Sequence, residues 1–279
     1  MKKKELKCND SVADTGKCTL RQIKDINELR SVQLGIMDSI HDFCLKNGIR
    51  YSLGGGTLIG AFRHRGYIPW DDDIDIYMLR EDYERFISIY NDNDRKYKLL
   101  KPGDTSRYIY TFAKVIDTRT IMTEDEVEGY EIGVYVDVFP LDFVTDNMRM
   151  RKIVFGAKKL LYKIRRCKIQ KNNPLKSYTA YLCYRYLPLS LSAIDWIISK
   201  YIHRRIPSGT ICEMTDTNRP LKGCYSIDCM ASTIDVTFED RTYKAMAGYD
   251  EYLSNTYGNY MKLPPKEQQT QHKFKAYFK

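Results

Sequence analysis

The sequence lacks any run of about 18 apolar residues, the length that a membrane-spanning helix needs. We therefore expect no ordinary transmembrane helix. Residues 1–7 are basic, but no apolar stretch follows them, so the sequence predicts no secretory signal peptide. Together these absences predict a cytoplasmic protein whose contact with a membrane, if it has one, is peripheral on the inner face.

The sequence also lacks closely spaced cysteine pairs. Its eight cysteines are scattered, which is typical of a reduced cytosolic protein with unlinked thiols. Cys212, Cys224 and Cys229, with His203 nearby, can be interpreted as a zinc site. Their spacing does not provide the close pairs of structural zinc motifs, apart from the looser interval between Cys224 and Cys229. We therefore favour unlinked thiols over zinc.

Acidic residues are almost absent from one long segment. Between Met148 and Ile206 there are fifteen Lys or Arg and a single acidic residue, Asp195, so this segment carries +14 and the rest of the +9 chain carries −5. A solvated helical face, a nucleic-acid surface and an anionic membrane surface each explain such a block. Because apolar residues and Trp196 interleave with the charges and no nucleic-acid motif is present, we favour a membrane or a lipid-linked substrate.

What the sequence does contain is enough apolar material for a large core. Its 279 residues, 43% of them hydrophobic, predict an α/β (α+β) protein with an added subdomain. Apolar periodicity predicts helices over 20–47, ending at Gly48, over 81–90 and over about 243–257. Short strands are predicted at 49–53, 108–116 and 133–142, with further short strands after residue 210.

Changes in composition divide the chain into four parts. We predict a mobile N-terminal tail over 1–20, a catalytic core over 21–147, a basic helical insertion or subdomain over 148–209 and a C-terminal part of the same domain over 210–279.

Four aspartates crowd into five residues at Asp71, Asp72, Asp73 and Asp75. Like charges this close need a cation, protons or full solvation. In a strand, residues two apart share a face, so Asp73 and Asp75 would point the same way between buried isoleucines. Since Mg²⁺ prefers carboxylates together with substrate phosphates, this pattern predicts a metal-dependent phosphoryl-transfer site. A calcium-binding loop fits poorly, because Ile76 stands where such a loop needs glycine.

Four further features accompany this cluster. Gly54, Gly55, Gly56 and Thr57 precede it, and glycine lets backbone N–H groups approach a phosphate closely. Arg63, His64 and Arg65 form a basic stretch that can bind phosphate oxygens or remain solvated. Lys114, in a predicted strand, is either a phosphate contact or a solvated edge lysine. Asp137 lies in a β-branched run where aspartate is rare, which suggests a metal shared with Asp73 and Asp75.

The longest of these motifs, LGGGTLIGAFRHRGYIPWDDDIDI over 53–76, closely resembles the signature of the LicD family of phosphotransferases, which includes the fukutin-type proteins. The resemblance continues at 135–142, 248–253, 257–261 and 264–265, and it covers roughly residues 25–279. It is weakest in the basic block.

The resemblance implies a nucleotidyltransferase-like fold, with a mixed sheet and helices related to polymerase-beta-type catalytic cores. It also implies that Asp73, Asp75 and Asp137 hold the metal, and that Gly55, Gly56 and Thr57 contact the donor phosphates. The implied reaction transfers a phospho-alcohol, typically phosphocholine from CDP-choline, to a hydroxyl of a cell-surface glycan or its lipid-linked precursor and releases CMP. Lipopolysaccharide, teichoic acid and capsule are such glycans, and other family members transfer ribitol phosphate.

In the mechanism that we expect, one or two Mg²⁺ or Mn²⁺ ions bind the donor phosphates. Asp137, or Asp71, orients or deprotonates the acceptor hydroxyl, while Arg63, His64 and Lys114 neutralise phosphate charge. A nucleotidyltransferase that attaches NMP is the alternative enzyme. A cation-dependent adaptor without catalysis is a third hypothesis, which the retention of all three carboxylates disfavours.

Overall fold

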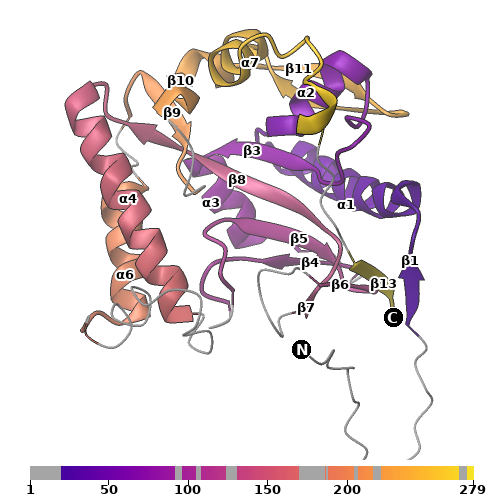
Figure 1. The fold of residues 1–279 in the computed structure, drawn as a ribbon, viewed down its shortest axis with the longest axis horizontal. Coiled ribbons are helices and arrows are strands. Elements are labelled where there is room, and N and C mark those ends of the chain that lie inside the picture. Colours follow the sequence, from indigo (N-terminus) through magenta and orange to yellow (C-terminus); the bar gives the residue numbers. More distant parts are fainter. Residues whose placement is uncertain are drawn as a thin grey trace, which may run out of the picture.

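The computed structural model describes residues 20–91, 96–104, 108–123, 131–169, 186, 188–203, 207–215, 221–269 and 275–279. The predicted N-terminal tail lies outside these residues except for Leu20. A mixed sheet occupies the centre, with helices around it (Figure 1), which confirms the predicted α/β class.

Strand β8 (Tyr135–Val144) organises the main sheet. It pairs in parallel with β3 (Asp75–Leu79). It also pairs antiparallel with β5 (Ala113–Asp117) along its first residues and with β9 (Thr210–Glu213) along its last ones. The sheet continues through three short strands, which are β2 (Ser52–Leu53), β4 (Tyr97–Leu100) and β10 (Tyr225–Ser226).

Two smaller sheets flank the main one. The first joins the beginning and the end of the described chain, because β1 (Arg21–Ile23) pairs with β13 (Lys275–Phe278), and β13 continues to β6 (Thr120–Thr123) and β7 (Glu131–Ile132). The second is the hairpin of β11 (Thr233–Phe238) and β12 (Arg241–Met246).

Helices α1 (Ile26–Asn47) and α3 (Arg80–Ile89) contact strands of the main sheet. The side chain of Asp25 caps the start of α1, and Gly48 ends it in the left-handed conformation at φ +61°, as the sequence predicts. The predicted helix began too early, since Arg21–Ile23 is strand β1.

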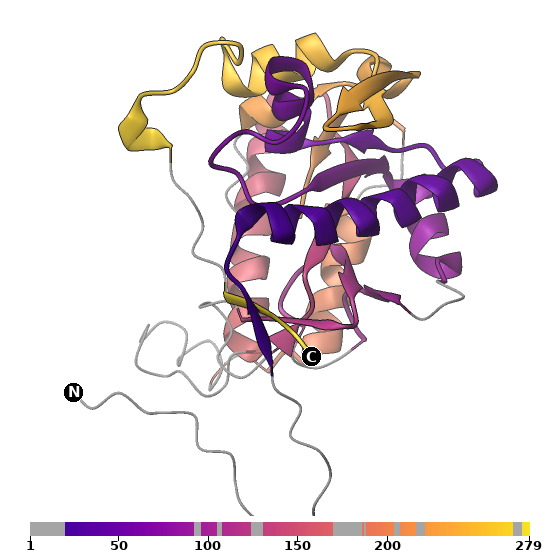
Figure 2. The ribbon, with the colours of Figure 1, turned by 90° about the vertical axis from the view of Figure 1, so that its right-hand side faces the viewer.

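The remaining helices lie around the other elements. Helix α4 lies at the left of Figure 1 and helix α1 at the right, and in Figure 2 α1 runs across the front with α4 behind it. These elements are α2 (Gly55–His64), α4 (Met148–Ile169), α6 (Leu191–Ile197), α7 (Tyr249–Tyr257), the π-helical turn η1 (Ile198–Ile202), and the 3₁₀ turns η2 (Leu221–Gly223), η3 (Ile227–Met230) and η4 (Lys266–Gln268).

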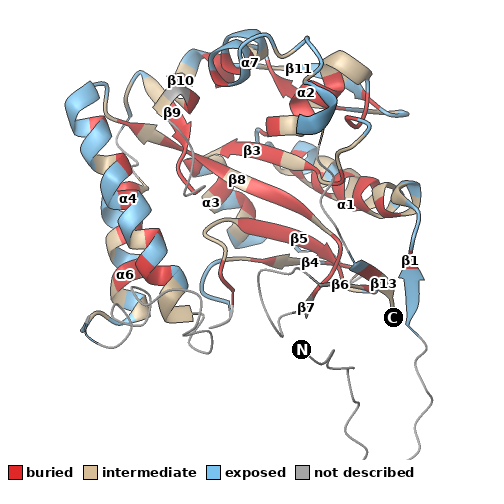
Figure 3. Cartoon of the chain, viewed as in Figure 1, coloured by how far each residue is buried: buried red, intermediate tan, exposed pale blue. Residues whose placement is uncertain are grey.

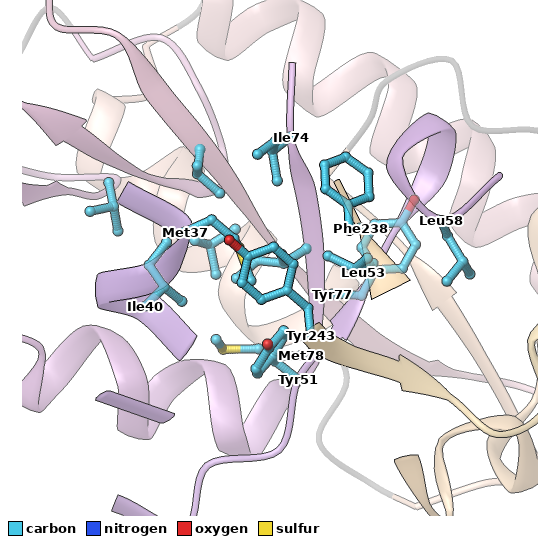
Figure 4. Packing of buried hydrophobic residues seen from close by; sticks show 14 of the residues in the cluster. Met37, Ile40, Tyr51, Leu53, Leu58, Ile74, Tyr77, Met78, Phe238 and Tyr243 are labelled. Carbon is cyan, nitrogen blue, oxygen red and sulfur yellow. The ribbon is translucent and has the colours of Figure 1, made fainter. Parts of the chain in front are cut away.

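Successive side chains of β3 point alternately toward the hydrophobic core and toward the opposite face of the sheet. Ile76 and Met78 are completely buried, and Figure 4 shows Met78 near Met37 and Ile40 of α1. Asp75 and Tyr77 point to the other face of the sheet. Figure 3 shows buried residues concentrated along β3, β8 and β5. One face of the sheet is therefore packed against helices, and the other is available for chemistry.

Two of the predicted elements are wrong in part. The strand predicted over 108–116 begins only at Ala113. The helix predicted over about 243–257 is strand β12 followed by α7, which starts at Tyr249 after Gly248. Alternating and helical apolar spacing are hard to tell apart over such short runs.

Helices α4 and α6 pack against each other and against residues of β8 and β9 in a cluster separate from the main core. The division of the chain at residues 147 and 209 stays a prediction. Within the described residues, no helix is both long enough and apolar enough to cross a membrane.

Removing the ion pair between α3 and β8 should destabilise the fold. Arg80 donates hydrogen bonds of 2.7 and 2.6 Å to the two carboxylate oxygens of Asp142, and both side chains are buried. We expect Asp142→Ala to lower the free energy of unfolding by about 3–5 kcal/mol, because it leaves a buried guanidinium without its counter-ion. Urea denaturation measures the change.

The matched control is Asp235→Ala, which breaks an exposed pair with Lys244 at 2.6 Å. Its effect should stay within about 1 kcal/mol. Equal losses in the two variants would contradict the importance of burial.

Candidate active site

Three charged side chains form a row across the main sheet. Asp75 of β3 is the register partner of Asp137 of β8, and Asp137 is in turn the partner of Lys114 of β5. Register partners share a face, so the three side chains lie on the face opposite to α1. The Lys114 ammonium is 2.7 Å from Oδ1 of Asp137, and Lys114 is only 1% exposed. The structure thus brings Asp75 and Asp137 together, with a lysine as their neighbour.

The first residue of β3 is fixed to the first turn of α2. The Asp75 N–H donates to Oγ1 of Thr57 at 2.9 Å, and the Asp75 carbonyl accepts from the N–H of Gly54 at 2.8 Å. Thr57, predicted as a phosphate contact, is buried and orients the backbone of a carboxylate residue here.

The carboxylates of Asp75 and Asp71 lie close to Gly55 and Gly56 in the first turn of α2. Gly55 has φ +48°, and a Cβ at this position would lie 2.9 Å from Oδ2 of Asp75. A Cβ at Gly56 would lie 2.7 Å from Oδ2 of Asp71. Only glycine leaves this room. The predicted glycine turn is therefore the start of a helix, and the positive end of that helix faces two carboxylates.

The carboxylates perturb one another. Burial, followed by the charges of Asp73, Asp137 and Asp71, raises the pKa of Asp75 well above its usual value, and Lys114 opposes the rise. Burial lowers the pKa of Lys114, which the charge of Asp137 opposes. The charges of three neighbouring carboxylates thus act on buried Asp75, an arrangement that favours the uptake of a proton or a cation there.

The donor set fits a hard divalent cation in its chemistry, because such ions take carboxylate oxygens and tolerate excess negative charge. Asp73, Asp75 and Asp137 are the candidate ligands. Within the described part of the chain, no three His, Cys, Asp or Glu side chains are grouped closely enough to hold a metal ion. Oδ1 of Asp137 is bonded to Lys114 instead. The metal role of these aspartates stays a prediction.

A cleft of about 590 Å³ opens over this face of the sheet. The volume lies within the range of about 300–1,000 Å³ that is typical of small-molecule sites. The lining residues come from α2, β3, the segment before β5, β8, α4, the segment after β9 and α7: Gly55, Gly56, Asp75, Tyr77, Ile109, Tyr110, Thr111, Phe112, Phe139, Lys159, Tyr162, Lys163, Arg165, Arg166, Thr215 and Tyr257. Carboxylate, aromatic and basic side chains therefore share one cavity.

The contribution of α4 was not predicted from the sequence. The basic block was interpreted as an outer surface, yet Lys159, Lys163, Arg165 and Arg166 line the same cleft as Asp75. The spacing of Lys159, Lys163 and Arg166 by four and three residues would have indicated one helical face, but it could not indicate which part of the molecule that face contacts.

Two predicted phosphate contacts lie elsewhere. Arg63 donates to the carbonyl of Tyr260 at 2.6 Å and to Nε2 of His64 at 2.9 Å. Burial and the charge of Arg63 lower the pKa of His64. Neither side chain lines the cleft. Arg63 thus holds the segment after α7, and a phosphate role for either residue stays a prediction.

Two residues that hold the acidic loop escaped the sequence analysis. Arg30 of α1 donates to the carbonyls of Ile68 and Asp71 at 3.0 and 2.6 Å. Gln33, one turn further, donates to the carbonyl of Asp72 at 2.7 Å and is 2% exposed. A glutamine within the apolar stripe of α1 was a usable signal, since buried polar groups need partners. Arg30 left no such signal.

Comparison with known proteins identifies the family. A family described as "LicD/FKTN/FKRP, nucleotidyltransferase domain" matches residues 48–179. The chain is 32% identical over 272 residues to the lipopolysaccharide cholinephosphotransferase LicD of Haemophilus influenzae, an alignment that covers 88% of this chain and 95% of the relative. This chain belongs to the LicD family. The resemblance seen in the sequence is confirmed, and the protein is a LicD-like phosphotransferase.

Two other matches are shorter. An uncharacterized protein of Rickettsia typhi is 43% identical over 134 residues, or 47% of this chain and 42% of that protein. The human ribitol 5-phosphate transferase FKRP is 37% identical over 68 residues, or 24% of this chain and 12% of its own.

Asp75→Asn should stabilise the protein when divalent metal is removed. A carboxylate whose pKa is raised by folding stabilises most below the unfolded pKa of about 3.9, and this contribution is lost as the pH rises through the folded pKa. The increase in stability of Asp75→Asn over the wild type should therefore be small at acid pH and grow toward pH 8. Thermal unfolding in EDTA across this range measures it.

The exposed residue Asp235 supplies the control, since Asp235→Asn should show no such growth. A stability difference for Asp75→Asn that does not change with pH would contradict the mutual repulsion of the carboxylates.

Proposed function

We propose that this protein transfers a phospho-alcohol, with phosphocholine as the first candidate, from a CDP-activated donor to a hydroxyl of a cell-surface glycan or its lipid-linked precursor. CMP is the second product. One observation carries the proposal: adjacent strands place Asp75 and Asp137 side by side, and Asp75 lines a cleft whose other walls are aromatic and basic. The cholinephosphotransferase relative supports the choice of phosphocholine.

Ribitol phosphate is the second candidate group, supported by the similarity to a ribitol 5-phosphate transferase. Both groups would reach the acceptor through the same bond changes. A hydroxyl oxygen of the acceptor forms a bond to the phosphorus distal to cytidine, and the bond from that phosphorus to the bridging oxygen breaks. The electron pair leaves with CMP.

Asp73, Asp75 and Asp137 would hold one or two Mg²⁺ or Mn²⁺ ions in this proposal. When bound, such an ion offsets the negative charge of the donor phosphates and of the leaving oxygen. The remaining contributions come from the chain itself. Asp137, or Asp71 beside Gly56, orients the acceptor hydroxyl and accepts its proton.

Lys114 and three aromatic residues that line the cleft, Tyr77, Phe112 and Phe139, would position the donor. Lys114 adds a buried positive charge next to Asp137, where phosphate charge is to be offset. The ring centroid of Phe139 lies 6.0 Å from that of Tyr77 and 4.2 Å from that of Phe112. Such rings can stack on cytosine or surround the ammonium of choline.

Replacing either paired aspartate should abolish transfer. We expect Asp75→Asn and Asp137→Asn to reduce CMP release from CDP-choline at least about a hundredfold, because each removes an electrostatic contribution at the reacting phosphates. The assay combines a panel of CDP-alcohols, lipopolysaccharide as acceptor and Mg²⁺. Wild-type release should stop in EDTA and return with Mg²⁺.

Asp235→Asn, a change of the same charge on an exposed strand, should retain wild-type turnover. Turnover that persists in Asp75→Asn or Asp137→Asn would contradict the mechanism. Release of pyrophosphate in place of CMP would support the nucleotidyltransferase alternative.

We also propose that the region of α4, α6 and η1 contacts the inner face of an anionic membrane, where lipid-linked acceptors would be found. Its exposed side chains combine basic residues with large apolar ones, as at Ile153, Leu160, Trp196 and Tyr201. Interfacial helices combine the two in this way. Nucleic acid is not an expected partner.

Ile153→Ser with Trp196→Ser should weaken binding to anionic vesicles about a hundredfold or more, because each exposed apolar side chain that enters the interface contributes about 1.5–3 kcal/mol. Vesicle pelleting at low and high salt measures it. The control is Ile234→Ser, an exposed apolar residue of β11. Absence of salt-sensitive binding by the wild type would contradict membrane contact.

A further inference from the structure

One edge of α4 presents cations to the catalytic cleft. Lys159, Lys163 and Arg166 are all exposed, line the cleft and follow one another at intervals of four and three residues, which places them on one face. Lys159 and Lys163 form no hydrogen bond or ion pair with any residue that the structure describes. Two lysines beside the cleft that have no partner among the described residues are available to bind an anion.

The position of these cations is fixed by buried contacts. Arg165, between them in sequence, is 3% exposed and donates to Oδ1 of Asp195 and to the carbonyl of Ile109, each at 2.7 Å. Tyr162 is buried, and its hydroxyl lies 2.9 Å from Nε2 of His203. Helix α4 is therefore tied both to the wall of the cleft and to the helical cluster behind it, so the lysines are held at the cleft.

We propose that Lys159, Lys163 and Arg166 bind a phosphate group carried by the acceptor glycan. The identity of the ligand as the acceptor rests on the proposed function. The cleft is polarised, since carboxylates gather at Asp75 and cations at α4. An anion that approaches the carboxylates is repelled unless a cation lies between them, whereas the basic residues of α4 attract an anion directly. Arginine adds a planar fork suited to phosphate oxygens.

The extent of the basic face favours the acceptor over the donor. Arg149 and Lys152 continue the same exposed face of α4 beyond the residues that line the cleft. From Arg149 to Arg166 the face runs about 26 Å at 1.5 Å per residue. A nucleotide donor confined to the cleft would meet only the second half of this face, while an extended anionic glycan would meet all of it.

Binding without turnover provides the first test. In EDTA and without donor, the wild type should bind glucose 6-phosphate about tenfold or more tightly than glucose, measured by titration calorimetry or ligand-observed NMR. Lys159→Gln with Lys163→Gln should bind the two sugars equally. The control, Lys46→Gln with Lys98→Gln, removes the same charge at exposed sites of α1 and β4 and should behave as the wild type.

The second test separates acceptor from donor. Glucose 6-phosphate should remain bound when CMP and Mg²⁺ are added in excess, and displacement would instead assign the lysines to the donor phosphates. With lipopolysaccharide as acceptor, the double substitution should raise the KM for the acceptor about tenfold and leave that for CDP-choline unchanged. This difference should vanish when phosphatase-treated lipopolysaccharide is the acceptor.

These outcomes stay distinct from those of the transfer reaction itself. If no CDP-alcohol yields CMP, the proposed function fails while the sugar-phosphate titrations still decide the role of α4. Equal wild-type affinity for glucose and glucose 6-phosphate would overturn the inference, as would loss of the preference in the Lys46 and Lys98 control.

Discussion

Mutual repulsion among carboxylates is the constraint around which this molecule is arranged. Asp71, Asp73, Asp75 and Asp137 influence one another at the point where β3 starts, and Lys114 is the cation placed next to them. Concentrated like charge opposes folding unless the chain holds it in place. Parallel pairing of β3 with β8, the glycines at the start of α2 and the threonine bond to the Asp75 backbone together impose the arrangement.

This arrangement explains why the two faces of the main sheet carry different kinds of side chains. The face toward α1 and α3 is apolar and closely packed, and it supplies the rigidity that the opposite face needs. The opposite face carries Asp75, Tyr77, Asp137 and Phe139, and helices from distant parts of the chain border it. The site is thus built from segments before residue 80, around 110 and 137, and beyond 159. Chemistry and stability are divided between two faces of the same strands.

Much of the site was visible in the sequence, for identifiable reasons. Alternation around Ile74 and Ile76, and an aspartate inside a β-branched run, predicted correctly that Asp75 and Asp137 would lie on strands, because strand geometry is local. The same alternation placed Asp73 on the strand, which begins only at Asp75. The long motif beginning at Leu53 predicted the family. The sequence did not predict that Gly55 and Gly56 begin a helix, nor that Arg63 turns to the carbonyl of Tyr260. Nor could the sequence place α4 at the cleft, since the contact between α4 and the cleft depends on packing between elements that are distant in the chain.

The hydrogen bonds from Arg30 and Gln33 to the acidic loop affect how easily this loop opens. Exposed loops usually open with little free energy and exchange their amide hydrogens quickly. Here two side chains of α1, a helix whose inner face is completely buried, bind carbonyls at Ile68, Asp71 and Asp72. Opening this loop would break bonds to the core helix itself. We therefore expect the loop and α1 to open as one cooperative unit, which limits the fluctuations of the candidate carboxylates.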